Sequence, residues 1–334
     1  MHKQKLIKLI KRILITFLSI ALLSLIVFYI SRLAPGDPLV SYFGERAQKL
    51  TAEERSLALS KLGLDQPIAV QYIRWLQHAL QGDFGISYKY KIPVTELISD
   101  RIGNTLILGG IGFIIIFFGA LILGCFCAWH EDKLTDRVIC TFGTVLGCIP
   151  EFWLSLIFIL IFAVTLRVLP SSGAYSIGGG DIADRIRHLI MPLSVVVIDH
   201  LWYYSYMVRN KLVSEFRADY VLCARAKGLS KAQIITRHCL RNIMPSYLSI
   251  MAVAVPHIIG GTYIVESVFA YPGLGTLIYE SARYKDYNLL MLLCIMTGAA
   301  VIVCGELAKL INERIDPRLR KSMRFTEDEE VDEL

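Results

Sequence analysis

The chain has 334 residues, of which 54% are hydrophobic and 19% are charged, and its formal net charge at pH 7 is +6. Charged residues make up roughly 25% of ordinary soluble domains, and the shortfall here comes from long uncharged runs, which indicate a membrane protein. The lysines and arginines gather between these runs, so the positive charge does not require nucleic acid as a partner. The eight cysteines lie mostly inside the apolar runs, without the spacing of a zinc site or a disulfide framework, so we expect packing residues and no metal.

Six segments are long and apolar enough to cross about 30 Å of hydrocarbon as helices of about 20 residues. They are 13–30, 105–129, 138–166, 189–208, 243–265 and 289–307. The first run is longer than the apolar part of a signal peptide, so we expect an uncleaved span. No segment alternates with period two as a barrel strand does. The sequence therefore predicts an all-α membrane protein with six transmembrane helices in one domain at 13–311.

Basic residues predict the orientation of these helices. Residues 1–12 and the loop 209–242 are strongly basic, and so is the beginning of the tail at 312–334. The segment 31–104, by contrast, has nine basic and eight acidic residues. Lys and Arg concentrate on the cytoplasmic side of membranes. We therefore expect both termini and the loop 209–242 in the cytoplasm, and the protein itself in the inner or plasma membrane of the cell. The acidic end of the tail predicts disorder.

The segment 31–104, predicted to be external, is too long for a simple connector. Thr51 and Glu54 have the spacing of a capping box, and Gly63 is placed to end the helix that they begin. A second helix is predicted from Pro67 to Leu80, where apolar residues recur at helical spacing. We expect these helices on the outer membrane surface or over the outer mouth of the bundle.

The loop 209–242 contains two predicted helices in place of a flexible linker. The first covers 219–228 and ends at a glycine, and the second begins at a capping box formed by Ser230 and Gln233. Small side chains in the first helix allow another surface to approach closely, and Tyr220, Val221 and Leu222 offer an apolar anchor. The residues alone leave two readings open: a helix that docks into a groove on a partner, or a helix that packs back on its own bundle.

These loop residues resemble the cytoplasmic signature loop of binding-protein-dependent ABC importer permeases, in particular the dipeptide/oligopeptide/nickel permease family. The loop motifs are Asp219-Tyr220-Val221, 224–229, 237–242 and Pro245. Further motifs of that family occur in order along the chain, at 33–38, 62–67, 71–72, 75–76, 82–87, 150–154, 169–173, 266–275 and 316–320. The chain departs from the wider superfamily at Leu222, where the family loop begins with Glu, and at Arg241, where Pro is usual; the second departure is common in the peptide branch.

The resemblance implies a type I ABC importer permease fold and a channel-forming subunit that works by alternating access. It also implies as partners a second homologous permease, two ATP-binding cassette ATPases and an extracytoplasmic binding protein. The lipid bilayer surrounds the permease subunits. No GxxxxGK[ST] motif occurs in the chain. We therefore expect no catalytic residue and no bound cofactor here, with ATP and Mg on the partner subunits. The residues implied to couple to the ATPase are Asp219, Tyr220, Val221, Ala224, Arg225, Ala226, Lys227 and Gly228.

Polar residues inside the predicted spans are candidates for the translocation path, because ionisable groups in the membrane usually face the protein interior or a water-filled cavity. They are Glu151, Asp199, His200, Tyr203, His257 and Glu266. The alternative is internal pairing that holds helices together, and Glu151 and Glu266 suit it best, since one follows Pro150 and the other lies near the outer boundary.

Two other functional classes remain as alternatives. A stand-alone secondary transporter or channel needs its own coupling-ion site and often an internal inverted repeat, and no repeat is evident. A membrane-embedded enzyme needs a catalytic motif, but 129–132 is not HExxH and no GxSxG occurs. The cargo is not specified by the sequence: the family's range covers dipeptides, oligopeptides, nickel, metal chelates and opine-like molecules.

Overall fold

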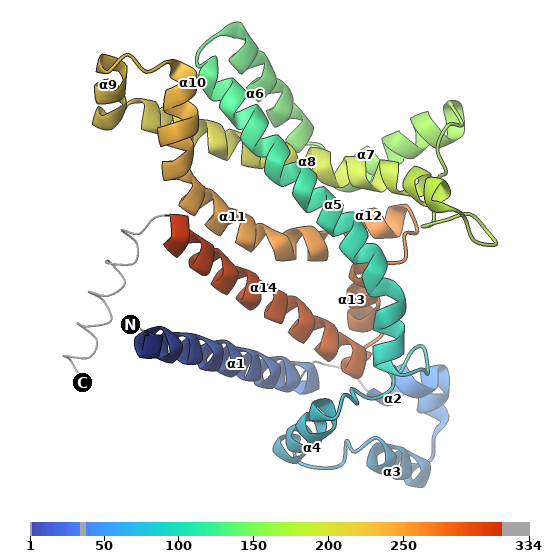
Figure 1. Cartoon of the computed structure of the whole chain (residues 1–334). Helices are drawn as coiled ribbons and strands as arrows, with labels where there is room; N and C mark the ends of the chain where they lie inside the picture. The colour runs from blue at the N-terminus through green and yellow to red at the C-terminus, as the bar shows by residue number, and fades with distance from the viewer. Residues whose placement is uncertain (1, 34–37, 316–334) are drawn as a thin grey trace. The chain divides into compact units, whose positions relative to one another are not determined.

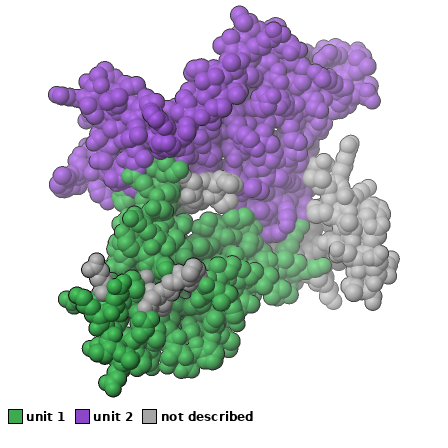
Figure 2. All heavy atoms as spheres, turned by 180° about the vertical axis from the view of Figure 1, so that it is seen from behind, with its two compact units in different colours: residues 1–106, 259–267, 272–302 green, residues 107–258, 268–271, 303–334 purple. Residues whose placement is uncertain are grey.

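The computed structural model describes residues 2–33 and 38–315, and these residues form an all-α protein (Figure 1). The described residues contain one β-type pairing, an isolated bridge between Ile86 and Pro93. From residue 316 on, the predicted tail lies outside the described residues. The chain divides into two compact units, one made of residues 1–106, 259–267 and 272–302 and the other of residues 107–258, 268–271 and 303–334 (Figure 2).

Each of the six predicted spans falls on a helix or a helix pair. By length and composition, three helices of the described chain are able to cross a membrane: α1 (His2–Leu33), α5 (Val94–Trp129) and α14 (Tyr287–Ile315). The fourth and fifth predicted spans lie on α8 (Ile182–Phe216) and α11 (Leu240–Gly261). The fourth of these spans is interrupted by charge, because α8 carries Asp199 and His200 near its middle.

The third predicted span, 138–166, is not one straight helix. It consists of α6 (Leu134–Gly147), α7 (Glu151–Phe158) and a π-helical continuation, Ile159–Thr165, and the chain bends by 95° between α6 and the rest. Pro150 precedes α7 directly, and a proline has no N–H for the helical ladder and clashes with the preceding turn. The bend thus corrects the continuous helix expected from hydropathy, because the helix restarts after Pro150.

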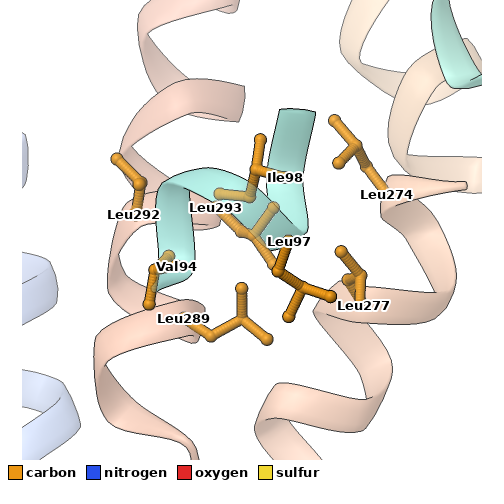
Figure 3. Close-up of a cluster of buried hydrophobic side chains, with 8 residues drawn as sticks. All are labelled: Val94, Leu97, Ile98, Leu274, Leu277, Leu289, Leu292 and Leu293. Atoms are coloured by element: carbon orange, nitrogen blue, oxygen red, sulfur yellow. The ribbon is translucent and has the colours of Figure 1, made fainter. Parts of the chain in front are cut away.

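The first unit has an apolar core where three helices meet (Figure 3). The beginning of α5 contributes Val94, Leu97 and Ile98, which pack against leucines of α13 (Leu274–Arg283) and α14. The leucines are Leu274, Leu277, Leu289, Leu292 and Leu293. Truncating a buried leucine typically costs about 2–5 kcal/mol, so this cluster supplies much of the packing that holds α5, α13 and α14 together.

The segment predicted to be external is helical, as the capping signals indicated. It contains α2 (Pro38–Phe43), a 3₁₀-helix at Gly44–Lys49, α3 (Ala52–Lys61) and α4 (Ile68–Leu80). Both hydrogen bonds of the capping box between Thr51 and Glu54 are present, and α3 is followed by Gly63 at φ +66°. Tyr72 and Trp75 of α4 pack on Phe28 of α1, with ring centroids 5.3 and 6.2 Å from it. This segment therefore packs on α1 through one face of α4.

Polar contacts join the same segment to α13. The ammonium of Lys89 lies 2.9 Å from the carboxylate of Glu280, and the hydroxyl of Tyr90 donates to the same carboxylate. Nearby, the fully buried carboxylate of Asp286 accepts hydrogen bonds from the Ser87 hydroxyl and the Lys89 backbone N–H. These contacts connect residues about 190–200 positions apart in the chain and fix the loop after α4 on α13.

In the second unit, small residues allow helices to approach closely. A Cβ on Gly143 of α6 would lie 2.6 Å from the Trp202 ring of α8, and a Cβ on Gly124 of α5 would lie 2.7 Å from Val208 of the same helix. Small residues at helix contacts are typical of membrane bundles, where packing replaces the hydrophobic effect as the force between helices. The sequence of this unit therefore specifies tight packing of α8 against both α5 and α6.

Candidate functional site

The predicted coupling loop contains two short helices, as expected. These are α9 (Asp219–Ala226) and α10 (Lys231–Ile234), and a π-helical turn, Ile235–Cys239, continues α10 into α11. Gly228 adopts φ +79° between the two helices, a left-handed conformation that costs residues with a Cβ about 1–2 kcal/mol. The capping box of Ser230 and Gln233 is complete. Arg209, taken from the sequence as the start of the loop, still lies within α8, so the connector is almost entirely helical.

The two faces of α9 have different surroundings. Val221 and Ala224 are 1% and 5% exposed and face the protein. Leu222 is 69% exposed, and Cys223, Arg225, Ala226 and Lys227 are exposed beside it. Of the three predicted anchor residues, Leu222 is exposed, Tyr220 is half-buried and Val221 is buried. The helix both packs on its own unit and leaves a face open, so the two readings of the sequence apply to opposite faces.

Tyr220 fastens α9 to its own unit. Its hydroxyl donates to the carboxylate of Glu215 on α8 and lies 3.6 Å from the sulfur of Cys239. Burial, followed by the hydrogen bond to Glu215, raises the pKa of Tyr220, so the hydroxyl keeps its proton and remains a donor. Asn242 donates to the same carboxylate over 3.2 Å. Glu215 thus joins the end of α8 to α9 and to the beginning of α11.

Further contacts tie this hairpin to α5. The ammonium of Lys231 donates to the carbonyl oxygen of Trp129 at the end of α5 and lies 5.6 Å from the centre of the indole ring. Arg217, just after α8, pairs with Glu131 over 3.0 Å. A displacement of α9 and α10 would therefore act directly on α5 and α8.

A second group of predicted residues converges between α7 and α8. Glu151 lies in the first turn of α7, and Asp199 and His200 lie in the middle of α8. One ligand-type atom from each of the three lies within 4.8 Å of the others. The Nδ1 atom of His200 is 3.2 Å from the Asp199 carboxylate and 3.1 Å from the carbonyl oxygen of Val196. The sequence predicted polar residues in the membrane here but not that they meet.

Asp199 also borders a cavity of about 370 Å³ between α5, α6 and α8. Trp202, Tyr203 and Tyr206 line it on α8, together with mainly apolar and small residues of α5 and α6. Tyr203, predicted for the translocation path, thus shares a cavity with Asp199. A mostly apolar cavity with a few polar groups at its wall is typical of small-molecule sites.

The remaining two candidates differ. The side chain of His257 lies outside the described residues. Glu266 lies on α12 (Tyr263–Val268), is completely buried, and accepts hydrogen bonds from Thr262 and the Thr276 backbone N–H over 3.0 and 2.9 Å. A Cβ on Gly273 would lie 2.1 Å from its carboxylate, so the glycine packs directly against it. These contacts favour the alternative stated for Glu266, internal pairing that holds helices together.

One ion pair was missed from the sequence. The guanidinium of Arg209 donates to both carboxylate oxygens of Asp136, over 2.8 and 2.5 Å, and joins α8 to the first turn of α6. Asp136 is 2% exposed at the level of its side chain. The thiols of Cys127 and Cys140 lie within 4.8 Å of that carboxylate. An acid in the first turn of an apolar helix was the available signal, but its partner 73 residues away was not visible in the sequence.

The sequence matches two family models. The model for the binding-protein-dependent transport system inner membrane component matches residues 120–321, and a model for the N-terminal part of such membrane components matches residues 5–109. Together they cover both compact units.

Similar proteins support the same assignment. The oligopeptide transport system permease protein AppB of Bacillus subtilis is 33% identical over 310 residues, which are 91% of this chain and 97% of that protein. The metal-staphylopine import system permease protein CntB of Staphylococcus aureus is 31% identical over 316 residues, 94% of this chain and 98% of that protein.

The fold has a solved counterpart. A chain of the MetNI methionine ABC transporter in an inward-facing conformation aligns with a TM-score of 0.53 and 15% identity, over 66% of this chain and 97% of that chain. This likeness establishes the type I importer permease fold for a multi-pass membrane protein. The chain therefore belongs to the family of binding-protein-dependent transport system inner membrane components, the permease subunits of ABC importers.

Proposed function

We propose that this permease subunit forms half of a channel that imports peptides or small metal complexes, and that the open face of α9 is where an ATPase subunit acts on it. The observation that carries the proposal is the division of α9 into a buried face, at Val221 and Ala224, and an open face centred on Leu222. A passive connector has no need of an exposed leucine beside small residues. A groove on a partner accepts such a helix face closely.

The contacts of the hairpin support its use as a lever. Tyr220 and Lys231 attach it to α8 and α5, the two long helices that border the cavity beside Asp199. When ATP closes the ATPase dimer, α9 moves with its ATPase and displaces the ends of both helices. Helix displacement of this kind switches a central cavity between the two sides of the membrane.

The remaining parts of the machine are proposed from family membership. This chain hydrolyses nothing: ATP and Mg are bound by two ATPase subunits, and a second homologous permease completes the channel. An extracytoplasmic binding protein delivers the cargo. The basic N-terminus, the loop 209–242 and the tail lie in the cytoplasm, in agreement with the excess of Lys and Arg on that side of membranes.

We place the cargo path of this unit at the cavity beside Asp199 and Tyr203. The relatives AppB and CntB are permeases for oligopeptides and for a metal–staphylopine complex, and both cargoes are small polar molecules. Asp199→Asn removes the charge and keeps the side-chain shape. We expect this variant to alter uptake or cargo selectivity, and unchanged transport would exclude Asp199 from the path.

The test of coupling compares two exposed leucines. Leu222 and Leu57 are 69% and 58% exposed, and they lie on α9 and on α3. We expect Leu222→Asp to abolish co-purification of the ATPase subunits from native membranes and ATP-dependent uptake in reconstituted vesicles. Leu57→Asp, the matched control, should preserve both. A wild-type chain that is isolated alone and transports without ATP would contradict the proposal and favour a secondary transporter.

A further inference from the structure

The bend at Pro150 brings the carboxyl group of Glu151 close to two polar residues on α8. Glu151 stands at the first position of α7 because the helix restarts after Pro150, while Asp199 and His200 are neighbours on α8. Their ligand-type atoms lie within 4.8 Å of one another. Broken helices at membrane depth are where many transporters bind ions, because the break turns a helix end and its side chains toward a cavity.

The two carboxyl groups of this cluster are balanced only in part by other side chains of the protein. Within the described part of the chain, the ion-pair partner of Asp199 is His200, and no lysine or arginine pairs with Glu151. The side chains of Asp199 and His200 are only 28% and 17% exposed. Two carboxylates at this distance in a membrane bundle repel each other, and either a proton shared between them or a cation bound between them removes the repulsion.

The three side chains offer a set of ligand atoms that favours some metal ions over others. Two carboxylate oxygens and one imidazole nitrogen suit divalent transition metals such as Zn²⁺, Ni²⁺ and Co²⁺, whereas Mg²⁺ and Ca²⁺ prefer oxygen alone. The Val196 carbonyl can only accept a hydrogen bond, so His200 Nδ1, 3.1 Å from it, is the donor there, and Nε2 is the ring nitrogen left for a metal ion. A metal-binding histidine is usually oriented by a hydrogen bond that its other ring N–H donates to a backbone or carboxylate oxygen.

Access for a complexed ion comes from the adjoining cavity. Asp199 is common to the three-residue group and to the 370 Å³ cavity. The aromatic side chains of Trp202 and Tyr203 line its wall and suit the organic part of a small chelate. An isolated ammonium group would be held by the carboxylates alone and would leave the imidazole without a role.

We infer that Glu151, Asp199 and His200 form a binding site for a divalent transition-metal ion, which reaches it as part of a small metal complex. This inference rests on the proposed importer function and narrows the cargo class from peptides or metal complexes to metal complexes.

The experiment uses the full chain, purified without a histidine tag, and titrates it with aqueous Co²⁺ while recording the visible absorption spectrum. We expect one site whose d–d bands indicate nitrogen and oxygen ligands. Glu151→Gln, Asp199→Asn and His200→Gln should each weaken binding at least tenfold, since loss of even an outer-shell partner costs about 10–100-fold. Glu306→Gln, a carboxylate change on α14 outside the group, should leave the affinity unchanged.

Two outcomes would overturn the inference. A thiolate-to-metal charge-transfer band that disappears in the Cys127→Ser/Cys140→Ser double variant would assign the metal to the thiol pair instead. Absence of saturable Co²⁺ binding, with uptake of a cationic peptide that depends on Asp199, would assign the group to an ammonium. Co-purification of the ATPase subunits is measured on the same preparations, so that loss of metal binding with the ATPases retained overturns only the metal site. Chromatographic profiles and melting temperatures of the isosteric variants identify any that fail to fold.

Discussion

Gly228 offers a direct test of how the turn between α9 and α10 contributes to coupling. Its φ of +79° lies in the left-handed region, and a Cβ at this position would have no atom within 4 Å. The cost of Gly228→Ala is therefore purely conformational, about 1–2 kcal/mol. An energy of that size shifts a local equilibrium about 5–30-fold. We expect the turn to open and α9 to lose its defined orientation in a corresponding share of the molecules.

Gly82 provides the matched control. It follows α4 with φ +83°, and a Cβ there would likewise meet nothing within 4 Å. Gly82→Ala should thus carry the same conformational cost in a segment that is not proposed to touch the ATPase. Asn tolerates the left-handed region better than Ala, so Gly228→Asn should lie between Gly228→Ala and the wild type.

The assay is substrate-stimulated ATP hydrolysis by the complete importer in proteoliposomes, with melting temperatures of the purified chain measured in parallel. We expect both alanine variants to melt at similarly lowered temperatures, but only Gly228→Ala to reduce stimulated hydrolysis several-fold. Equal hydrolysis in the two alanine variants would refute a role of the turn in coupling. A Gly228→Asn variant as defective as Gly228→Ala would refute the conformational explanation.

Three further predictions concern stability. Glu266→Gln replaces one carboxylate oxygen by a donor beside Thr105, Thr262 and Thr276, so that a buried group loses its partner; we expect a loss of about 1–3 kcal/mol in denaturant unfolding, and an unchanged midpoint would contradict a structural role. Burial raises the pKa of Glu280, but hydrogen bonds from a neighbouring tyrosine and lysine outweigh it and lower the pKa below the ordinary 4.5. Its stabilising effect is complete above pH 4.5 and is lost as the pH falls through the lowered value, so the melting temperature should drop more steeply below pH 4.5 in the wild type than in Glu280→Gln, and parallel curves would disprove this. Asp136→Asn leaves Arg209 as an unpaired, half-buried cation and should lower the free energy of unfolding by about 3 kcal/mol, the low end for broken buried pairs. The added change Arg209→Met should restore most of this stability. No recovery in the double variant would show that the ion pair is not the cause.

Local signals predicted most of the helices. The capping boxes at Thr51 and Ser230, the glycine after each short helix and the proline before α7 all act within a few residues, and the structure has a helix boundary at each of them. The motif order along the chain likewise identified the permease family, which the family models confirm. The coupling role of α9 and the orientation in the membrane stay predictions.

The sequence by itself determined the all-α membrane class, the capped ends of the short helices and the family, because hydropathy, capping and turn chemistry are properties of neighbouring residues. Only the tertiary structure decided which face of α9 is open, that Glu266 is buried among hydrogen bonds, and that Arg209 pairs with Asp136. Only the 95° bend between α6 and α7 brings Glu151 to Asp199. Such contacts depend on the packing of distant helices against one another, and a pattern read along one chain does not contain the directions in which helices turn after they break.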